Sequence, residues 1–180
     1  MFLLLSAPGT GTNFVLQFLT FTGWKQSRLR INTEQEADFV LTHSHLPTLR
    51  EFEEKIGPIG EHFSKVVIPL RHPYRSYRSR TGRGESGQEL IEYWRGLTEF
   101  ADKFPQVYYV PLEVAVDKRV ELMQGLADFV GLKKGPWVTD YATNWTPVNK
   151  TRDMSLKLKN YIPGFSFAVE WYRTSLQESI

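Results

Sequence analysis

The sequence predicts an α/β fold with three layers, in which a mostly parallel central sheet lies between helices. Short apolar runs of strand length alternate with helix-length amphipathic stretches over residues 1–130. These runs are continuous and rich in β-branched residues, as is typical of strands buried on both faces. A turn of small residues follows the first run, at the sheet edge where ligands of parallel sheets bind.

Each element is predicted by its own pattern. Continuous apolar runs predict strands at residues 2–5, 37–42, 65–70 and 106–110. Amphipathic stretches predict helices at residues 13–22, 47–56, 73–80, 87–103 and 117–130. Gly23 and Gly131 are expected to end the first and the last of these helices, because glycine is the preferred residue just after a helix.

The C-terminal part of the chain has a different pattern, with aromatic side chains that follow no strand rhythm. We expect two helices, near residues 154–161 and 165–177, separated by Pro163 and Gly164. No repeat or low-complexity linker interrupts the chain. We therefore interpret residues 1–180 as a single domain, with a core at 1–132 and a helical C-terminal segment at 133–180.

Composition argues against several classes of protein. The 180 residues include 22 Lys and Arg, 20 Asp and Glu and no Cys, and 41% are hydrophobic. A net charge of +2 argues against a generally cationic surface for nucleic acids, and the lack of cysteine excludes disulfides, zinc–thiolate sites and a cysteine nucleophile. The first apolar run is too short for a signal peptide or a membrane span. We expect a cytoplasmic protein without a membrane span, and the oligomeric state stays open.

A glycine-rich loop follows the first strand, with the sequence SAPGTGTN at residues 6–13. Its two glycines allow backbone N–H groups to turn inward, and the following helix contributes the positive end of its dipole. The threonines and Asn13 add side-chain donors. A P-loop of ATP and GTP enzymes would carry a lysine, and this loop has none. The expected phosphate-binding residues are Pro8, Gly9, Thr10, Gly11, Thr12 and Asn13.

A second candidate anion site follows the strand predicted at residues 65–70. Arg71 would emerge at the carboxyl edge of the sheet, beside the glycine loop, and Ser79 lies two helical turns further on. A guanidinium and a hydroxyl suit a second phosphate, because bidentate charge-assisted hydrogen bonds hold a dianion well. The alternative is that the five arginines from Arg71 to Arg83 form a solvated basic face or bind RNA.

Together these two segments resemble the signature motifs of sulfotransferases that use 3′-phosphoadenosine 5′-phosphosulfate (PAPS). In that family a strand-loop-helix near the N-terminus binds the 5′-phosphosulfate, and residues 6–14 resemble it. The family holds the 3′-phosphate with an arginine after a later strand and a serine eight residues on, which match Arg71 and Ser79. The segment Leu41–Pro47 resembles the Thr-His-Leu-Pro segment, with His45 in the place of the catalytic base, and Val110–Glu113 resembles the Tyr-Glu-Asp-Leu segment.

The resemblance implies a P-loop-like sulfotransferase core and transfer of a sulfuryl group from PAPS to a hydroxyl or amine, which releases 3′,5′-ADP without a metal. His45 would accept the acceptor proton, a role suited to the histidine side chain, whose unperturbed pKa is about 6.5. His43 is the reserve base, and Glu85 or Glu113 is the fallback. The acceptor, a small molecule or a glycan, stays open.

The sequence departs from the family at Gly9, where the phosphosulfate loop usually carries a lysine. Either another cation replaces it, with Lys150 and Arg75 as candidates, or transfer is slow or absent. The alternatives are therefore a catalytically weak module that binds PAPS or 3′,5′-ADP, and a P-loop protein similar to nucleotide kinases.

Overall fold

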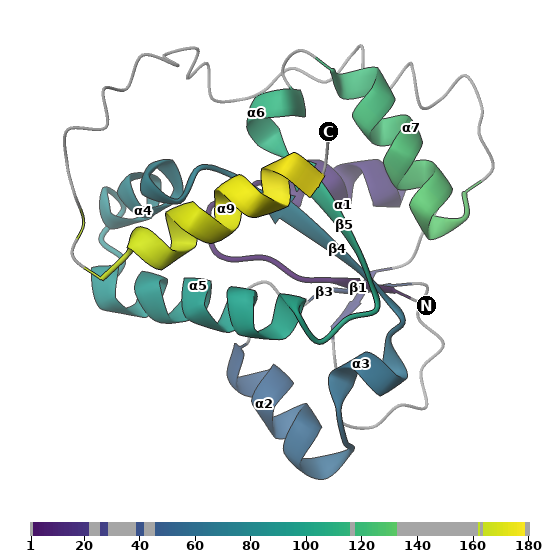
Figure 1. Cartoon of the computed structure of the whole chain (residues 1–180), viewed down its shortest axis with the longest axis horizontal. Coiled ribbons are helices and arrows are strands. Elements are labelled where there is room, and N and C mark those ends of the chain that lie inside the picture. Colours follow the sequence, from purple (N-terminus) through teal and green to yellow (C-terminus); the bar gives the residue numbers. More distant parts are fainter. Residues whose placement is uncertain are drawn as a thin grey trace.

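The chain folds around a parallel sheet of five strands in the order β2-β3-β1-β4-β5 (Figure 1). The computed structural model describes residues 2–21, 26–28, 39–41, 46–115, 118–132, 162 and 164–178. The strands are β1 (Phe2–Leu4), β2 (Gln26–Arg28), β3 (Phe39–Leu41), β4 (Lys65–Leu70) and β5 (Gln106–Pro111). This confirms the predicted α/β class with a parallel sheet.

Helices connect the strands and follow them. They are α1 (Thr12–Phe21), α2 (Leu46–Lys55), α3 (Ile59–His62), α4 (Pro73–Thr81), α5 (Gly87–Ala101), α6 (Leu112–Ala115), α7 (Arg119–Val130) and α9 (Ser166–Glu178). The last of these confirms the helix expected at 165–177, whereas the one expected at 154–161 lies outside the described residues. Gly131 ends α7 in a left-handed conformation with φ 80°, as predicted.

Three elements were not predicted, and each has a physical reason. Strand β2 has the polar sequence QSR, because an edge strand pairs on one side only and has less need of apolar side chains. Helices α3 and α6 each have four residues, which is too short for a helical period to show in the sequence.

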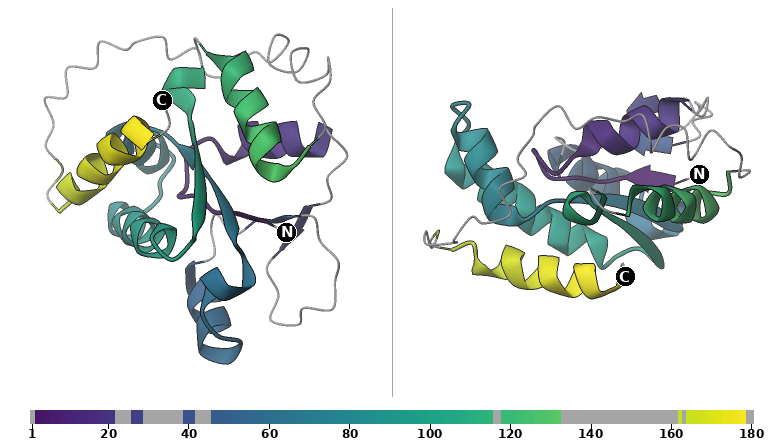
Figure 2. Two further views of the ribbon diagram at one scale, coloured as in Figure 1. Left: turned by 45° about the vertical axis from the view of Figure 1, so that its right-hand side comes forward. Right: turned by 90° about the horizontal axis from the view of Figure 1, so that it is seen from above.

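Both faces of the sheet are buried along β1 and nearly all of β4, which explains why these two strands are almost continuously apolar. In β1 and the residue after it, Leu3 and Leu5 belong to the apolar cluster that includes Trp94 of α5 and Phe165. Leu4 faces the other way, into the cluster formed with α1 and α7. Figure 2 shows α1 and α7 on one side of the sheet and α5 and α9 on the other. No helix of the described residues is long and apolar enough to cross a membrane.

Helix α9 is held to the core mainly by aromatic side chains. Trp94 of α5 is fully buried, and its ring lies edge-on to Phe165 and Trp171, with centroid distances of 5.9 and 6.3 Å. Phe165 also stacks on Tyr74 of α4, at 5.9 Å. The C-terminal helix therefore packs against the helix that begins at the carboxyl edge of β4.

We predict that Trp94→Ala lowers the free energy of unfolding by about 3–5 kcal/mol, because it leaves a cavity between α5 and α9. Urea unfolding followed by circular dichroism measures the loss. Glu92→Ala is the control on the exposed side of the same helix and should change stability by less than about 0.5 kcal/mol. Equal effects of the two substitutions would contradict the role given to Trp94.

Candidate functional site

The candidate site lies at the carboxyl ends of the neighbouring strands β1 and β4. The chain passes from β1 to β2 and β3 on one side of the sheet, and then crosses to β4 and β5 on the other side. Such a reversal of strand order leaves a crevice at the carboxyl edge, where ligands of open α/β sheets bind. The glycine loop follows β1 and Arg71 follows β4, so the topology brings the two predicted anion sites together.

The glycine loop is shaped by its own hydroxyl groups. Gly9 and Gly11 have φ of 80° and 97°, and a Cβ on Gly11 would lie 2.4 to 2.9 Å from side-chain carbons of Leu112. Thr10 Oγ1 donates to the Ala7 carbonyl at 2.7 Å, and the hydroxyls of Ser6 and Thr12 are 2.7 Å apart. These side chains are buried, so they hold the turn. The Thr10 hydroxyl is therefore used within the loop, which differs from the expectation that it donates to a phosphate. The Thr12 hydroxyl can accept from Ser6 and still donate to an anion.

Backbone N–H groups are the donors that the loop presents. Among the described residues, no hydrogen-bond acceptor is found for the backbone N–H groups of Gly9, Gly11, Thr12 and Asn13. The first helical turn closes on the Gly11 carbonyl, which accepts from the Phe14 N–H at 2.9 Å. Unpaired N–H groups at the start of the ten-residue helix α1 are suited to bind an anion.

Two hydrogen bonds reach the glycine loop, one from helix α4 and one from Arg71, which follows β4. Ser76 Oγ donates to the Pro8 carbonyl at 2.6 Å, and Ser76 is fully buried. Arg71 Nη1 donates to the Gly9 carbonyl at 3.4 Å. The loop therefore turns two carbonyl groups toward α4 and Arg71. In the peptide unit of Pro8 and Gly9 this directs the Gly9 N–H the opposite way, whereas the Thr10 N–H bonds to the Ala7 carbonyl at 3.4 Å.

Ser76, whose hydroxyl joins α4 to the loop, was not among the residues predicted from the sequence. Ser79, the predicted partner of a 3′-phosphate, lies on α4 and is partly exposed; its hydroxyl makes no hydrogen bond to the described residues, so its role stays a prediction. Ser76 lies in the first turn of α4, and its N–H bonds to the His72 carbonyl at 3.1 Å. A hydroxyl in the first turn of a helix that follows a buried strand is the signal that would have indicated it.

Arg71 lies among other charged side chains. Partial burial lowers the pKa of its guanidinium, the carboxylate of Glu113 opposes this effect, and the positive charges of Arg75 and Arg83 lower the pKa further. An arginine stays charged at neutral pH even so. Arg71, Arg75 and Arg83 repel one another and together create a positive potential at this edge of the sheet. An anion bound there would reduce the repulsion.

Glu113 connects the ends of β4 and β5 with α9. Its Oε1 accepts from the backbone N–H of His72 at 3.0 Å, and its Oε2 accepts from the Tyr172 hydroxyl at 3.1 Å. Burial, together with the Glu113 charge, raises the pKa of Tyr172, so the phenol stays protonated and donates. Both carboxylate oxygens are engaged, which gives Glu113 a structural role rather than that of a base.

Of the remaining candidate bases and cations, the structure describes Glu85 but not the two histidines or Lys150. Glu85 is paired with Arg80. His43, His45 and Lys150 lie outside the described residues, although β3 ends at Leu41, on the same sheet edge as the glycine loop. No group of three or more His, Cys, Asp or Glu side chains that could hold a metal ion occurs among the described residues.

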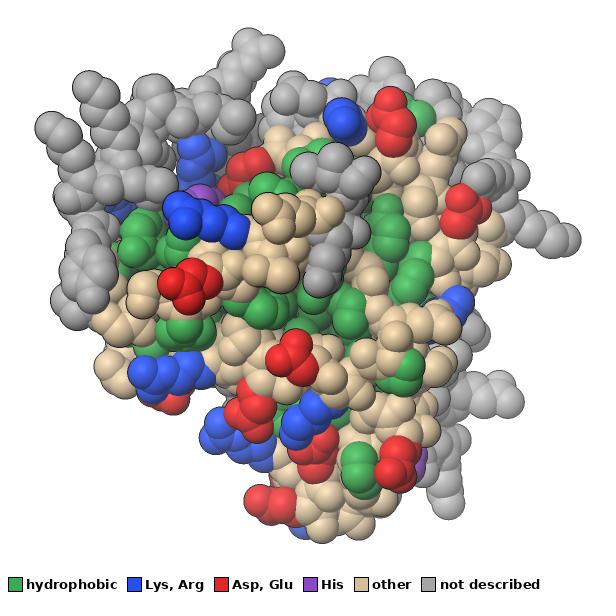
Figure 3. Space-filling model, in the orientation of Figure 1, with side chains coloured by type: hydrophobic (Ala, Val, Ile, Leu, Met, Phe, Trp, Pro, Cys, Tyr) green, Lys and Arg blue, Asp and Glu red, His purple; other side chains and the backbone are tan. Residues whose placement is uncertain are grey.

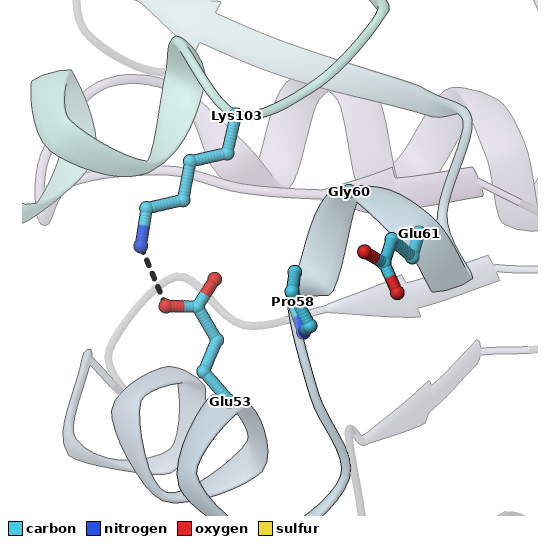
Figure 4. A pocket seen from close by; sticks show the side chains of 5 residues that line it. All are labelled: Glu53, Pro58, Gly60, Glu61 and Lys103. Carbon is cyan, nitrogen blue, oxygen red and sulfur yellow. Dashed lines mark hydrogen bonds and ion pairs between the residues drawn. The ribbon is translucent and has the colours of Figure 1, made fainter.

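A pocket of about 350 Å³ lies at the opposite edge of the sheet, near the amino ends of β4 and β5 (Figure 4). Its lining includes Glu53 of α2 and Lys103, whose charged groups pair across it at 2.5 Å. Gly60 completes one wall, where a Cβ would collide with the Lys103 carbonyl. The pocket is thus separate from the edge that carries the glycine loop.

We predict that His72 makes the protein less stable at acidic pH. Burial lowers the pKa of its ring, Glu113 opposes this, and Arg75 and Arg173 add to the lowering. The ring also lies edge-on to Tyr74 and Tyr172. Below about pH 6.5 the unfolded chain therefore binds a proton at this histidine, whereas the folded chain binds it only at a lower pH. The free energy of unfolding thus falls as the pH drops from about 6.5 toward the pKa of the folded ring.

His72→Phe should flatten this pH dependence. Unfolding in urea at several values between about pH 7.5 and pH 5 measures it. His62→Gln, which replaces an exposed histidine, is the control. A wild-type slope retained by His72→Phe would show that the protonation of His72 is not coupled to unfolding.

Comparison with known proteins adds no family assignment. No family model matches the chain, and no curated protein matches it significantly. The functional argument therefore depends on the residues and their geometry.

Proposed function

We propose that this chain is a sulfotransferase that binds PAPS at the glycine loop and Arg71 and transfers its sulfuryl group to a hydroxyl or amine. The observation that carries the proposal is the direct joining of the two anion-binding features. Arg71 donates to the Gly9 carbonyl, and Ser76 donates to the Pro8 carbonyl. A donor with phosphate groups at both its 5′ and 3′ positions is the kind of ligand that two adjacent anion sites would accept.

The reaction makes specific demands on the site. The acceptor oxygen or nitrogen attacks sulfur, the bond from sulfur to the 5′-phosphate oxygen breaks, and the acceptor proton passes to a base. Charge builds on the leaving phosphate oxygen, where preorganised donors are most effective. The N–H groups of Gly11, Thr12 and Asn13 and the dipole of α1 are donors of this kind, because they are fixed by the fold before any ligand binds.

The base is assigned to a histidine. Glu113 and Glu85 already accept hydrogen bonds from His72, Tyr172 and Arg80, so a proton on either carboxylate would weaken existing contacts. This supports His45, with His43 in reserve, as the group that takes the acceptor proton. A histidine suits the role because it is deprotonated at neutral pH and close enough in pKa to bind a proton.

The alternatives are less well supported. A kinase-like P-loop would use a loop lysine, which this chain lacks. RNA binding would need a continuous basic surface, whereas Arg71 and Arg80 contact the glycine loop or Glu85. The face in Figure 3 also has Lys and Arg interspersed with Asp and Glu. A module that binds the nucleotide without turnover is the second candidate, favoured by Gly9.

We predict that Arg71→Ala weakens binding of 3′,5′-ADP by about 10- to 100-fold, because a charge-assisted pair with phosphate contributes on the order of 1.5–3 kcal/mol. Isothermal calorimetry measures the dissociation constant. Arg50→Ala removes an exposed arginine from α2 and serves as the control for net charge. Unchanged affinity in Arg71→Ala would exclude Arg71 from the nucleotide site.

We predict that His45→Ala lowers sulfuryl transfer from labelled PAPS by about 100-fold or more, with little change in the affinity for 3′,5′-ADP. His62→Ala is the matched control, and transfer is measured with a panel of hydroxyl and amine acceptors. Tight binding of 3′,5′-ADP by the wild type without transfer to any acceptor would favour the binding module. Equal loss of binding and transfer would contradict the role of His45.

A further inference from the structure

Gly9 is packed against α4 at the place where the related loop carries a lysine. Its φ is 80°, a conformation that residues with a Cβ rarely adopt. A Cβ on Gly9 would lie 3.1 Å from Ser76 Oγ, 3.1 Å from Arg80 Cγ and 3.2 Å from Arg80 Cδ. A side chain at position 9 would therefore be strained by the backbone conformation, and Ser76 or Arg80 would have to move by a few tenths of an ångström to admit it.

The side chain that fills this space is itself cationic. Ser76 and Arg80 are four residues apart on α4, so both lie on the helix face that contacts the loop. The aliphatic part of Arg80 crosses Gly9 at Cγ and Cδ, and the guanidinium carbon follows two bonds further on. A positive charge thus approaches the glycine loop from α4 instead of from the loop.

Glu85 holds that guanidinium in place. Arg80 Nε bonds to Glu85 Oε2 at 2.7 Å, and Arg80 Nη2 contacts Glu85 Oε1. The Glu85 N–H also bonds to the Arg80 carbonyl at 3.3 Å, so the two residues close a tight turn at the end of α4. A guanidinium has five N–H donors, and Nη1 of Arg80 makes no hydrogen bond to the described residues.

We propose that Arg80 replaces the missing lysine as the cation of the glycine loop and binds the 5′-phosphate or phosphosulfate group through its guanidinium. Glu85 acts as a positioning residue, which orients Arg80 and competes with the anion for it. This inference rests on the proposed function, because it names a further residue of the same donor site. Arg75, the earlier candidate for this cation, instead lies in the charged environment of Arg71 and His72.

The matched variants are Arg80→Met and Arg78→Met. Methionine keeps an aliphatic stem against Gly9 and removes the charge, so the loop keeps its packing. Arg78 is an exposed arginine on the same helix, so Arg78→Met changes the net charge equally. Glu85→Gln keeps the shape of the competing side chain without its charge, and urea unfolding checks that every variant is folded.

Three ligands distinguish binding of the 5′-phosphate from binding of the 3′-phosphate. Calorimetry with 3′,5′-ADP, 5′-AMP and adenosine 3′-phosphate should show that Arg80→Met weakens the first two about tenfold and leaves the third unchanged. Arg78→Met should leave all three unchanged. Glu85→Gln should tighten the first two by a few fold, because a partly exposed carboxylate no longer competes for Arg80.

Four results would overturn the inference. They are unchanged binding of 3′,5′-ADP in Arg80→Met, an equal loss in Arg78→Met, a loss that also affects adenosine 3′-phosphate, and weaker binding in Glu85→Gln. If Arg80→Met fails to fold, Arg80→Lys and Glu85→Gln carry the test, with Arg80→Lys expected to retain most of the affinity.

The proposed function is tested by results other than those that test Arg80. If the wild type binds 5′-AMP as tightly as 3′,5′-ADP and Arg80→Met weakens both, Arg80 serves the loop but the 3′-phosphate has no site. If the wild type binds none of the three ligands, the proposed function and the role of Arg80 are both wrong.

Discussion

The contact between helix α4 and the glycine loop is the constraint on which the rest of the site depends. Ser76 and Arg71 each donate to a loop carbonyl, and Arg80 lies across Gly9. Because the N–H and carbonyl of one peptide unit point in opposite directions, the bond from Ser76 to the Pro8 carbonyl presents the Gly9 N–H on the other side of the loop. Glycine at position 9 fits the same contact, since a Cβ there would press against Ser76 and Arg80.

A second interaction fixes where α4 begins. Glu113, just after β5, accepts hydrogen bonds from the His72 backbone and from Tyr172 of α9. His72 is the residue before α4, so the carboxylate sets the start of that helix relative to the sheet. The C-terminal helix thereby reaches the candidate site through a hydrogen bond as well as through the aromatic packing around Trp94. A half-buried carboxylate with both oxygens engaged is well suited to such a structural role.

The sequence was sufficient to predict the α/β class and to place the glycine loop and Arg71 at one edge of the sheet, where the candidate site lies. The run at residues 65–70 is β4, and the small-residue turn and Arg71 lie together because parallel strands end at one edge. The roles of individual hydroxyl groups could not be predicted, because they depend on the spatial direction of carbonyl groups. Thr10 and Ser76 each donate to a backbone carbonyl, at Ala7 and Pro8. The position of Ser76 in the first turn of α4 can be read from the sequence, but the carbonyl that it reaches cannot.

The same geometry gives a physical reason why the cation beside the glycine loop would come from helix α4 rather than from the loop itself. A lysine in the loop would need a backbone conformation compatible with a Cβ, whereas the φ of 80° at Gly9 brings α4 close enough for Ser76 to bond to the loop. An arginine on that helix then restores the charge, with a planar fork that Glu85 orients beforehand. Preorganisation of this kind lowers the cost of ordering a long side chain when the anion binds. The absence of a lysine from the loop and the close approach of α4 are thus two aspects of one packing arrangement.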